Sequence, residues 1–335
     1  MRIALITPHY WPVVCGNAVT VRRIEHHLRL LGCTLDVFGL DSISGDSAAE
    51  QIMAGGYDLC HAFHAHEGGT VARTAANRRN IPYVITLTGS DVYMACSDSR
   101  RDETFTALAG STRIVSFHKD IAERLVHELP SISDRIAIIP QGVQLPDRIQ
   151  VKQPNDHFTF LLPAGLRPVK NVLFSLEPLA ELAIAEPDLR LVLAGPVMDE
   201  EYAAQVIDRL RHYPFADYIG VVEHQEMGKL YQQSSVVLNS SISEGGMANS
   251  LLEAMAWGRP ILAAAIEGNR SLVTDGVTGL LYRNSEEFYA KARQLMTDAV
   301  LGEQLTRAAQ QMLAEKHSPE REAAEYLKLY QDILS

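Results

Sequence analysis

A polar, glycine-containing loop in the second half of the chain carries residue types that bind phosphate. The loop follows a predicted strand that ends near Asn239, and an amphipathic helix is expected to begin around Ala248. The first N–H groups of a helix have no partner within it, and the helix dipole adds partial positive charge there, so this geometry binds anions. Gly245 and Gly246 would let the backbone approach such a ligand without a Cβ atom in the way.

Two carboxylates bracket this loop. Glu244 precedes the glycines, and Glu253 lies in the expected helix, where its two oxygens could accept hydrogen bonds from the hydroxyls of a ribose. The alternative is structural: Glu244 would merely support the start of the helix, and Glu253 would be a solvated helix residue.

A second loop between a strand and a helix carries two basic residues three positions apart. Arg167 could hold a phosphate through two parallel hydrogen bonds, and Lys170 would add a mobile point charge. Two basic residues in a loop are also typical of a solvated surface. Because the same predicted domain contains the glycine loop, we favour a clamp for a diphosphate that needs no metal ion.

The first strand is followed by a long loop that ends in Gly16 and Asn17, with Asn17 as the expected N-cap of the first helix. The loop lacks the GxGxxG spacing of a dinucleotide fingerprint, which argues against an NAD enzyme. No spacing in the chain indicates a Ser-His-Asp triad, a Cys-His pair or a nucleophile elbow.

Two other groups of polar residues end strands in the first half. His61, His64 and His66 alternate at the end of the third strand, and Thr88 and Asp91 follow the fourth. Alternating histidines resemble metal ligands, but we do not expect a zinc site here, and at least one of the three should pack in the core or be solvated.

These residues require a framework of alternating strands and helices. The β-α-β rhythm predicts parallel sheets covered on both faces, with ligands beyond the carboxyl ends of the strands. The expected strands are Ile3–Ile6, Leu35–Phe38, Leu59–Phe63, Tyr83–Leu87, Arg113–Ser116, Arg135–Ile139, Phe158–Leu162, Arg190–Ala194, Asp217–Ile219, Val236–Asn239, Pro260–Ala263 and Gly279–Tyr282.

A chain of 335 residues is long enough for about two domains. The polar segment 144–157 has no apolar period and contains two prolines, so we interpret it as the interdomain linker. The predicted domains are residues 1–150 and residues 151–317, with a cleft between them. Residues 318–335 form a final helix, which Ser318 caps and which should bury Ala324, Leu327 and Leu329.

Composition narrows the class of protein further. With 30 basic and 41 acidic residues the net charge is −11, so nucleic acid is not the expected partner. No apolar run reaches the roughly 18 residues that span a membrane, and Pro8 interrupts the N-terminus too early for a secretory signal. The four cysteines lack Cys-x-x-Cys spacing, which suits reduced thiols in a cytoplasmic protein.

Taken together, these segments resemble the retaining glycosyltransferases of the GT-B type in glycosyltransferase family 4. The hallmarks are Gly165-x-Arg167-x-x-Lys170 and Ser243-Glu-Gly followed by Leu252-Glu253-Ala-Met, in the expected order. The resemblance runs along the whole chain. The segments Gly16-Asn17-x-x-Thr20-x-x-Arg23 and Leu87-Thr-Gly-Ser-Asp91 are most similar to two subgroups, the glycosyltransferase-1-domain-containing protein type and the selenosugar synthases of selenoneine biosynthesis.

The resemblance implies an α/β fold of two Rossmann-like, doubly wound parallel-sheet domains that face each other across a cleft. It implies transfer of a sugar from a nucleotide-diphosphate donor, in the first instance a UDP-sugar, to an acceptor that the sequence does not identify. The reaction would retain anomeric configuration and use no metal. The nucleotide sugar would be a co-substrate, so no cofactor is expected, and membrane contact would be at most peripheral.

The resemblance also implies roles for individual residues. Arg167 and Lys170 would stabilise the leaving diphosphate, Glu253 would bind the ribose, and residues 220–223 would face the base. The full set is Arg167, Lys170, Glu244 and His64 for catalysis; Gly16, Asn17, Gly165, Gly220, Glu223, Gly245, Gly246, Met247, Ala248, Asn249 and Glu253 for the donor; and Thr88 and Asp91 on the acceptor side.

The chain departs from the family pattern in two places. Eight residues separate Glu244 from Glu253 where the family usually has seven, so either a bulged loop keeps Glu244 pointing inward or Gly245 takes the acidic position. Thr88 stands where a histidine commonly approaches the sugar, and His64 is the hypothesised replacement. Two other functions remain open: a GT-B-like sugar-phosphate epimerase or phosphorylase, and a nucleotide-sugar-binding protein with impaired catalysis.

Overall fold

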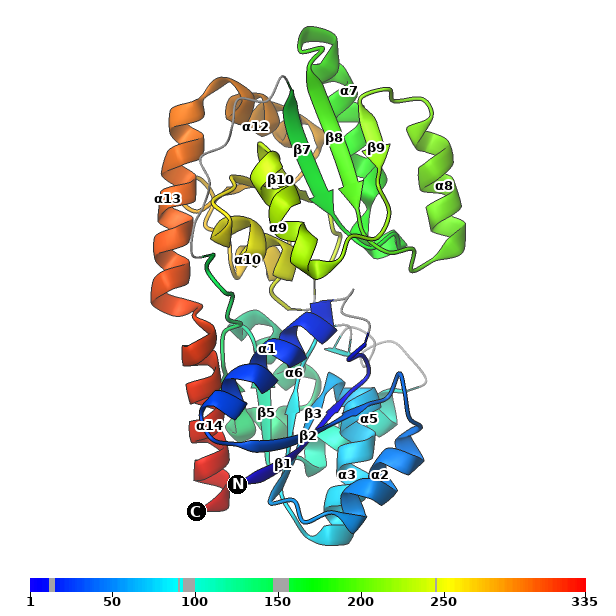
Figure 1. Cartoon of the computed structure of the whole chain (residues 1–335), viewed down its shortest axis with the longest axis vertical. Helices are drawn as coiled ribbons and strands as arrows, with labels where there is room; N and C mark the ends of the chain where they lie inside the picture. Colours follow the sequence, from blue (N-terminus) through cyan, green and yellow to red (C-terminus); the bar gives the residue numbers. More distant parts are fainter. Residues whose placement is uncertain (12–15, 90, 93–99, 147–156, 245) are drawn as a thin grey trace. The chain divides into compact units, whose positions relative to one another are not determined.

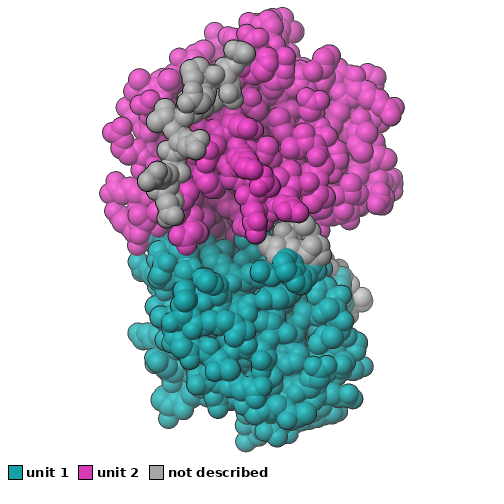
Figure 2. All heavy atoms as spheres, viewed as in Figure 1, with its two compact units in different colours: residues 1–142, 316–335 teal, residues 143–315 magenta. Residues whose placement is uncertain are grey.

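The computed structural model describes residues 1–11, 16–89, 91–92, 100–146, 157–244 and 246–335. The chain divides into two compact units, shown in Figure 2: unit 1 comprises residues 1–142 and 316–335, and unit 2 comprises residues 143–315. The predicted domain boundary after residue 150 lies outside the described residues. Within the described part of the chain, no helix combines the length and apolar character that crossing a membrane requires.

Unit 1 contains a parallel sheet of six described strands in the order β2-β1-β3-β4-β5-β6. The strands are β1 (Arg2–Thr7), β2 (Thr34–Gly39), β3 (Leu59–Phe63), β4 (Tyr83–Thr86), β5 (Arg113–Ser116) and β6 (Ile136–Ile138). The helices of unit 1 are α1 (Gly16–Leu30), α2 (Gly45–Ala54), η1 (His64–Gly68), α3 (Gly69–Arg79), α5 (Arg101–Gly110), α6 (Lys119–Glu128), η2 (Pro130–Arg135) and α14 (Pro319–Leu334).

Both faces of this sheet are buried, as the apolar strand sequences predict. Ile3 and Leu5 of β1 belong to a core cluster that includes residues of α1 and α14. Ala4 and Ile6, which point to the opposite face, belong to a second cluster that includes residues of α2 and α3. Since successive side chains of a strand alternate between the two faces, a continuous apolar run is what a sheet covered on both sides requires.

Unit 2 contains a second parallel sheet of six described strands in the order β12-β11-β10-β7-β8-β9. The strands are β7 (Phe158–Pro163), β8 (Leu189–Ala194), β9 (Ala216–Tyr218), β10 (Val236–Asn239), β11 (Ile261–Ala264) and β12 (Leu280–Tyr282). Its helices are η3 (Pro168–Lys170), η4 (Val172–Ser175), α7 (Leu176–Ala185), α8 (Glu200–Leu210), α9 (His224–Gln233), α10 (Asn249–Ala256), α11 (Glu267–Arg270), α12 (Ser285–Thr297) and α13 (Ala299–Lys316).

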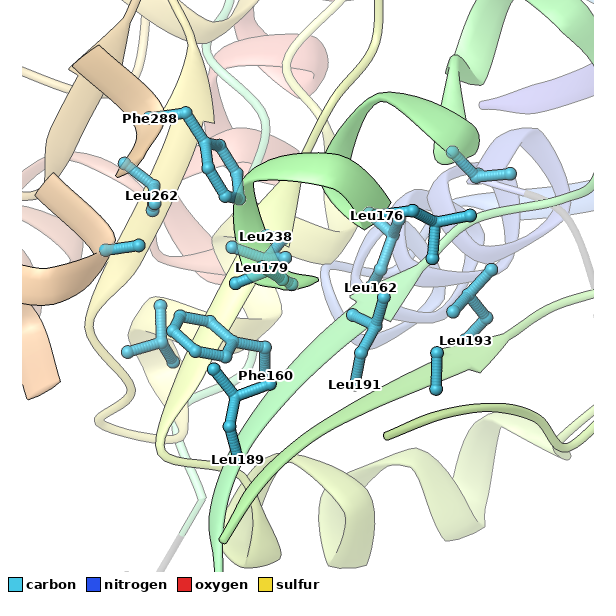
Figure 3. Packing of buried hydrophobic residues seen from close by; sticks show 14 of the residues in the cluster. Phe160, Leu162, Leu176, Leu179, Leu189, Leu191, Leu193, Leu238, Leu262 and Phe288 are labelled. Atoms are coloured by element: carbon cyan, nitrogen blue, oxygen red, sulfur yellow. The ribbon is translucent and has the colours of Figure 1, made fainter. Parts of the chain in front are cut away.

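The core of unit 2 follows the same alternation. Figure 3 shows Phe160 and Leu162 of β7 packed with Leu179 of α7 and Phe288 of α12 on one face of the sheet. Leu161, between them in sequence, joins the cluster on the other face, which includes residues of α10. All twelve predicted strands are present, and each end agrees with the prediction to within one residue. The predicted α/β fold class, with two parallel sheets, is therefore confirmed.

Helix α14 belongs to unit 1 although unit 2 precedes it in the sequence, and Figure 1 shows it beside α1. Ser318 caps it as predicted, accepting a hydrogen bond from the N–H of Arg321 at 3.1 Å. The prediction that Ala324 is buried is wrong. The buried face of the helix is shifted by one residue from the predicted face: Ala323, Tyr326 and Tyr330 are buried, and Ala324 is exposed. Leu327 and Leu329 are half-buried at the edge of the same cluster.

A buried network of hydrogen bonds explains why this face of α14 packs against the sheet. His61 of β3 lies 2.7 Å (Nε2) from Thr86 Oγ1 and 2.6 Å (Nδ1) from Tyr330 Oη, and Tyr326 Oη lies 3.0 Å from Thr86 Oγ1. Burial lowers the pKa of His61 to about 3, so the imidazole is neutral at pH 7. The ring nitrogen Nδ1 has its hydroxyl partner only if Tyr330 faces the sheet, and Tyr326 on the same helix face extends the network through Thr86. His61 is therefore a packing residue.

A buried ion pair joins α1 to α14. Arg23 donates two hydrogen bonds to the carboxylate of Glu322, from Nε at 2.8 Å and from a terminal nitrogen at 3.0 Å. Only 1% of the Glu322 side chain and 11% of the Arg23 side chain are exposed. Thr20, one turn earlier on α1, accepts a hydrogen bond from Gln141 at 3.1 Å. The two polar residues of the Thr20-x-x-Arg23 segment thus hold unit 1 together.

We predict that Glu322→Ala destabilises unit 1 by about 3–5 kcal/mol, because it leaves the charge of Arg23 buried and unpaired. The matched control is Glu325→Ala on the same helix, which removes a more exposed pair with Arg321 (3.0 Å) and should cost about 0.5 kcal/mol or less. Urea unfolding followed by circular dichroism measures both. Equal losses for the two variants would show that the buried pair has no special role.

Candidate functional site

The two phosphate-binding loops predicted from the sequence follow neighbouring strands of unit 2. Strands β7 and β10 pair in parallel, with Val236 opposite Phe160 and Val237 opposite Leu161. The chain runs outward from β7 through β8 to β9 and then returns to β10 on the other side of β7. The carboxyl ends of β7 and β10 therefore form a topological switch point, which is where open α/β sheets bind ligands.

Hydrogen bonds fasten these two loops to each other. Ser240 Oγ donates to the carbonyl oxygen of Lys170 at 2.9 Å, and the N–H of Ile242 donates to the carbonyl oxygen of Val169 at 3.0 Å. Lys170 Nζ donates to Glu244 Oε1 at 2.5 Å. The structure thus brings together Lys170 and Glu244, two of the residues predicted for catalysis, although 74 positions separate them in the sequence.

The carboxylate of Glu244 is fixed by further donors on the same oxygen. Ser241 Oγ donates to Oε1 at 2.6 Å, and Asn239 Nδ2 donates to it at 3.3 Å. Burial by itself would raise the pKa of Glu244, but the charge of Lys170 and the hydrogen bonds from Lys170, Ser241 and Asn239 hold that pKa below its ordinary value. Glu244 is therefore ionised at neutral pH.

A second layer of contacts supports Glu244 from α11. Asn269 Nδ2 donates to Asn239 Oδ1 at 3.1 Å and to the carbonyl oxygen of Ala264 at 2.9 Å. At Gly268, an added Cβ atom would lie 2.6 Å from Glu244 Cβ and 2.8 Å from the carbonyl oxygen of Gly246. The backbone of α11 therefore packs directly against the loop.

The sequence analysis did not identify the residues of this supporting layer. The polar run Asn239, Ser240 and Ser241 at the end of an apolar strand is a local signal that could have identified Asn239 and Ser241, and the structure buries all three. Asn269 and Gly268 carry no such signal. They belong to α11, which follows β11, so they contact the loop of Glu244 from a different element of the chain.

Arg167 lies on the same loop as Lys170. Its side chain is half-buried, and its Nε atom is buried without a hydrogen-bond partner among the described residues. Buried polar atoms in folded proteins nearly always have a partner, so this nitrogen is a donor that an anionic ligand would satisfy. Asn171 then adopts a left-handed conformation (φ 45°) and turns the chain toward α7.

Gly165 lies where two loops of unit 2 pack closely. A Cβ atom there would lie 2.7 Å from Met198 Sδ, on the loop that follows β8. Gly195, which the sequence analysis did not single out, has a φ of +154°, and its added Cβ would lie 2.2 Å from the carbonyl oxygen of Ala164. Both glycines allow the loops after β7 and β8 to pack closely, so that Arg167 and Lys170 are presented at this edge.

Glu253 lies on α10 with partners from α9. Tyr231 Oη donates to Glu253 Oε2 at 2.9 Å, and His224 Nδ1 lies 3.7 Å from Glu253 Oε1. Burial and the adjacent carboxylate raise the pKa of Tyr231 well above its ordinary value, so its hydroxyl stays protonated and donates. Among the residues expected to face a base, Gly220 has a φ of +79° and Glu223 is exposed directly before α9.

The start of α10 lies at the carboxyl edge of the sheet, as predicted. Met247 and Ala248 are buried, Gly246 is half-buried, and the helix begins at Asn249. Ala248 occupies the N-cap position and has no side-chain oxygen, so the helix lacks a side-chain cap. The remaining predicted residue of this loop, Gly245, lies outside the described residues.

In unit 1, the structure brings together the segments of His64, Thr88 and Asp91. Asp91 is 1% exposed and accepts backbone hydrogen bonds from Ala65 (2.8 Å), Gly89 (2.6 Å) and Thr88 (3.2 Å). His64 is 6% exposed and has a φ of +72°, which is rare outside glycine. Its Nδ1 accepts a hydrogen bond from the N–H of Glu67 at 3.2 Å.

Asn17 lies inside α1, which begins at Gly16, so its predicted N-cap position is wrong by at least one residue. Its Nδ2 donates to Thr7 Oγ1 at 3.0 Å, and its Oδ1 is buried without a hydrogen-bond partner among the described residues. His66 Nδ1 lies 3.3 Å from Thr104 Oγ1. In the part of the chain that the structure describes, no three His, Cys, Asp or Glu side chains are grouped as metal ligands would be.

Comparison with known proteins finds similarity to glycosyltransferases. Residues 157–298 match the family described as glycosyl transferases group 1. The chain is 25% identical over 327 residues to glycosyltransferase 1 domain-containing protein 1 of Xenopus tropicalis, covering 94% of this chain and 93% of the relative. It is 26% identical over 297 residues to a D-inositol 3-phosphate glycosyltransferase of Frankia alni, covering 78% of this chain and 72% of the relative.

Two solved structures share the fold of the whole chain. HepE of Anabaena, solved in complex with UDP-glucose, has a TM-score of 0.83 at 15% identity and covers 99% of this chain and 100% of its own. Sucrose-phosphate synthase of Thermosynechococcus elongatus has a TM-score of 0.83 at 16% identity and covers 99% of this chain and 98% of its own. The fold is that of the GT-B glycosyltransferases. With its glycosyltransferase group 1 domain at residues 157–298, the chain is a glycosyltransferase.

We predict that Gly268→Ala destabilises unit 2 by about 1–3 kcal/mol, because its Cβ would force the backbone of Glu244 and Gly246 to move. The matched control is Gly302→Ala in α13, where the nearest atom to an added Cβ is Pro260 Cγ at 3.5 Å. That substitution should stabilise by about 0.5–1 kcal/mol through helix propensity. Thermal unfolding measures both, and shifts of the same sign would contradict the packing described here.

Proposed function

We propose that the chain transfers a sugar from a nucleoside-diphosphate donor, in the first instance a UDP-sugar, to an acceptor nucleophile, with retention of anomeric configuration and without a metal ion. The observation that carries the proposal is the placement of Arg167 and Lys170 on the loop after β7, fastened to the loop that leads into α10. HepE, which shares the fold, was solved with UDP-glucose bound, and this supports the choice of donor.

The diphosphate would bind to this pair of loops. Arg167 contributes a buried nitrogen that lacks a partner in the described residues. Lys170 contributes an ammonium with three protons, and its hydrogen bond to Glu244 uses one of them. The uncapped start of α10 adds backbone N–H groups and the positive end of the helix dipole. These groups would stabilise the negative charge that develops on the leaving phosphate, which is the largest contribution the protein can make to the rate.

The rest of the donor would lie along the same edge of the sheet. Glu253, which Tyr231 holds in place, would accept hydrogen bonds from the ribose hydroxyls, and residues 220–223 would face the base. Glu244 would accept hydrogen bonds from the hydroxyls of the sugar. The carboxylate of Glu244 is ionised and held in a fixed position. This supports Glu244, and not Gly245, as the residue at the position of the family's first glutamate.

The bond changes require no nucleophile from the protein. The bond between the anomeric carbon and the terminal phosphate oxygen breaks, and the bond to the acceptor oxygen forms on the same face of the sugar. The acceptor proton moves to the departing phosphate oxygen. We propose that unit 1 serves the acceptor side through Thr88, Asp91 and His64. Asp91 there acts on the backbone, since it accepts hydrogen bonds from Ala65 and Thr88.

Binding of a nucleoside diphosphate tests the proposal without knowledge of the acceptor. At 100 times its dissociation constant, the correct nucleotide from a panel of UDP, GDP and ADP should stabilise unit 2 by about 2.7 kcal/mol in a thermal-shift assay. Arg167→Ala removes charged hydrogen bonds to a buried anion. It should weaken this shift and lower kcat/KM for transfer by about 30- to 1000-fold, or about 2–4 kcal/mol.

The matched control is Arg211→Ala, because the Arg211 side chain is 74% exposed and lies outside the two loops. It should leave both the thermal shift and kcat/KM unchanged. If no nucleotide stabilises the chain, or if both variants behave alike, the proposed donor site is wrong.

The proposed role of His64 is tested separately. His64→Ala should lower the rate of diphosphate release from the bound nucleotide sugar at least about tenfold, as expected for a group near the reacting sugar, while the dissociation constant of the donor stays unchanged. His64→Asn retains a side-chain acceptor for the N–H of Glu67 and tolerates a positive φ, so it separates chemistry from backbone strain. Full turnover by both variants would exclude His64 from the mechanism.

A further inference from the structure

A carboxylate stands beside the cation that would hold the diphosphate. Lys170 Nζ donates to Glu244 Oε1 at 2.5 Å, and the two side chains are 18% and 12% exposed. A phosphate oxygen that accepts a hydrogen bond of about 2.8 Å from Lys170 therefore lies at most about 5.3 Å from Glu244 Oε1. A site for an anion thus contains a negative charge within a short distance of that anion.

Glu244 cannot avoid this contact by rotating. Ser241 and Asn239 both donate to its Oε1, and the backbone of Gly268 packs against its Cβ atom. Glu244 does not avoid it by taking up a proton either, because the charge of Lys170 and the hydrogen bonds outweigh the effect of burial on its pKa. Its other oxygen, Oε2, has no hydrogen-bond partner among the described residues, so it can accept a donor from a ligand.

The two nucleotides that such a site meets differ in the group that faces Glu244. In a nucleotide sugar the terminal phosphate is esterified to the sugar and carries a single negative charge, and the sugar hydroxyls beside it are hydrogen-bond donors. In the free nucleoside diphosphate that group is the unesterified end of the phosphoanhydride, which carries a charge of about −1.5 to −2 at pH 7 and has no such hydroxyls. An ionised carboxylate accepts hydrogen bonds from the first and repels the additional charge of the second.

We propose that Glu244 makes the site discriminate between the nucleotide sugar and the nucleoside diphosphate that remains after transfer. This inference rests on the function proposed above. Arg167 and Lys170 attract both ligands, whereas Glu244 opposes the product alone. Glu244 is therefore a specificity-determining residue that favours the substrate over the product and speeds release of the product.

The test compares two dissociation constants in the full chain, those of UDP and UDP-glucose, by isothermal titration calorimetry. The corresponding GDP and ADP pairs are measured in parallel. In Glu244→Gln, which removes the charge but keeps the shape and an oxygen for Lys170, UDP should gain affinity relative to UDP-glucose by at least about tenfold. The matched control is Glu253→Gln, which alters a carboxylate proposed to bind the ribose that both ligands share. It should weaken both ligands equally and leave their ratio unchanged.

The outcomes separate this inference from the function on which it rests. If both ligands bind but their affinity ratio in Glu244→Gln stays within about twofold of the wild-type ratio, the inference is overturned and the donor site stands. The same conclusion follows if Glu253→Gln changes the ratio equally. If the wild-type chain binds none of the nucleotide pairs, both fail. Should Glu244→Gln not fold by circular dichroism, Glu244→Ala decides with the same criterion.

Discussion

The contact between Lys170 and Glu244 is the interaction on which the candidate site depends. It joins the loop after β7 to the loop after β10, and it places a positive and a negative charge side by side where water has limited access. Removing either charge from this place would leave the other one unpaired, which is costly in a partly buried position. The pair therefore holds Lys170 at the carboxyl edge of the sheet and keeps Glu244 ionised.

The fold supplies the conditions for this contact. Because the strand order reverses beside β7, two loops that are far apart in the sequence leave the sheet next to each other. Close packing then sets their positions: Gly195 admits the backbone of Ala164, and Gly268 admits the backbone of Glu244. A side chain at either glycine would separate elements that have to touch. In this site the glycines position the charged residues, in addition to any contact that they make with a ligand.

The sequence predicted those features that have a local cause. The strands and the starts of α10 and α14 follow from the alternation of apolar runs with capping and glycine residues. The basic loop and the paired glutamates are short motifs, each in one stretch of chain. Partners from distant elements have no such signal. Asn269 supports Glu244 from a helix after the next strand, and Tyr231 reaches Glu253 from α9. Helix α14 was predicted correctly as an element, but its buried face carries Tyr330, which is a hydroxyl partner of His61, and Tyr326, which bonds to Thr86.

The most direct measurement is a crystal structure of the chain soaked with UDP. The account predicts the diphosphate at the carboxyl edge of the sheet of unit 2, with phosphate oxygens within about 3 Å of Arg167 and Lys170 and the ribose beside Glu253. UDP bound at another place, or a guanidinium of Arg167 directed away from the nucleotide, would contradict it.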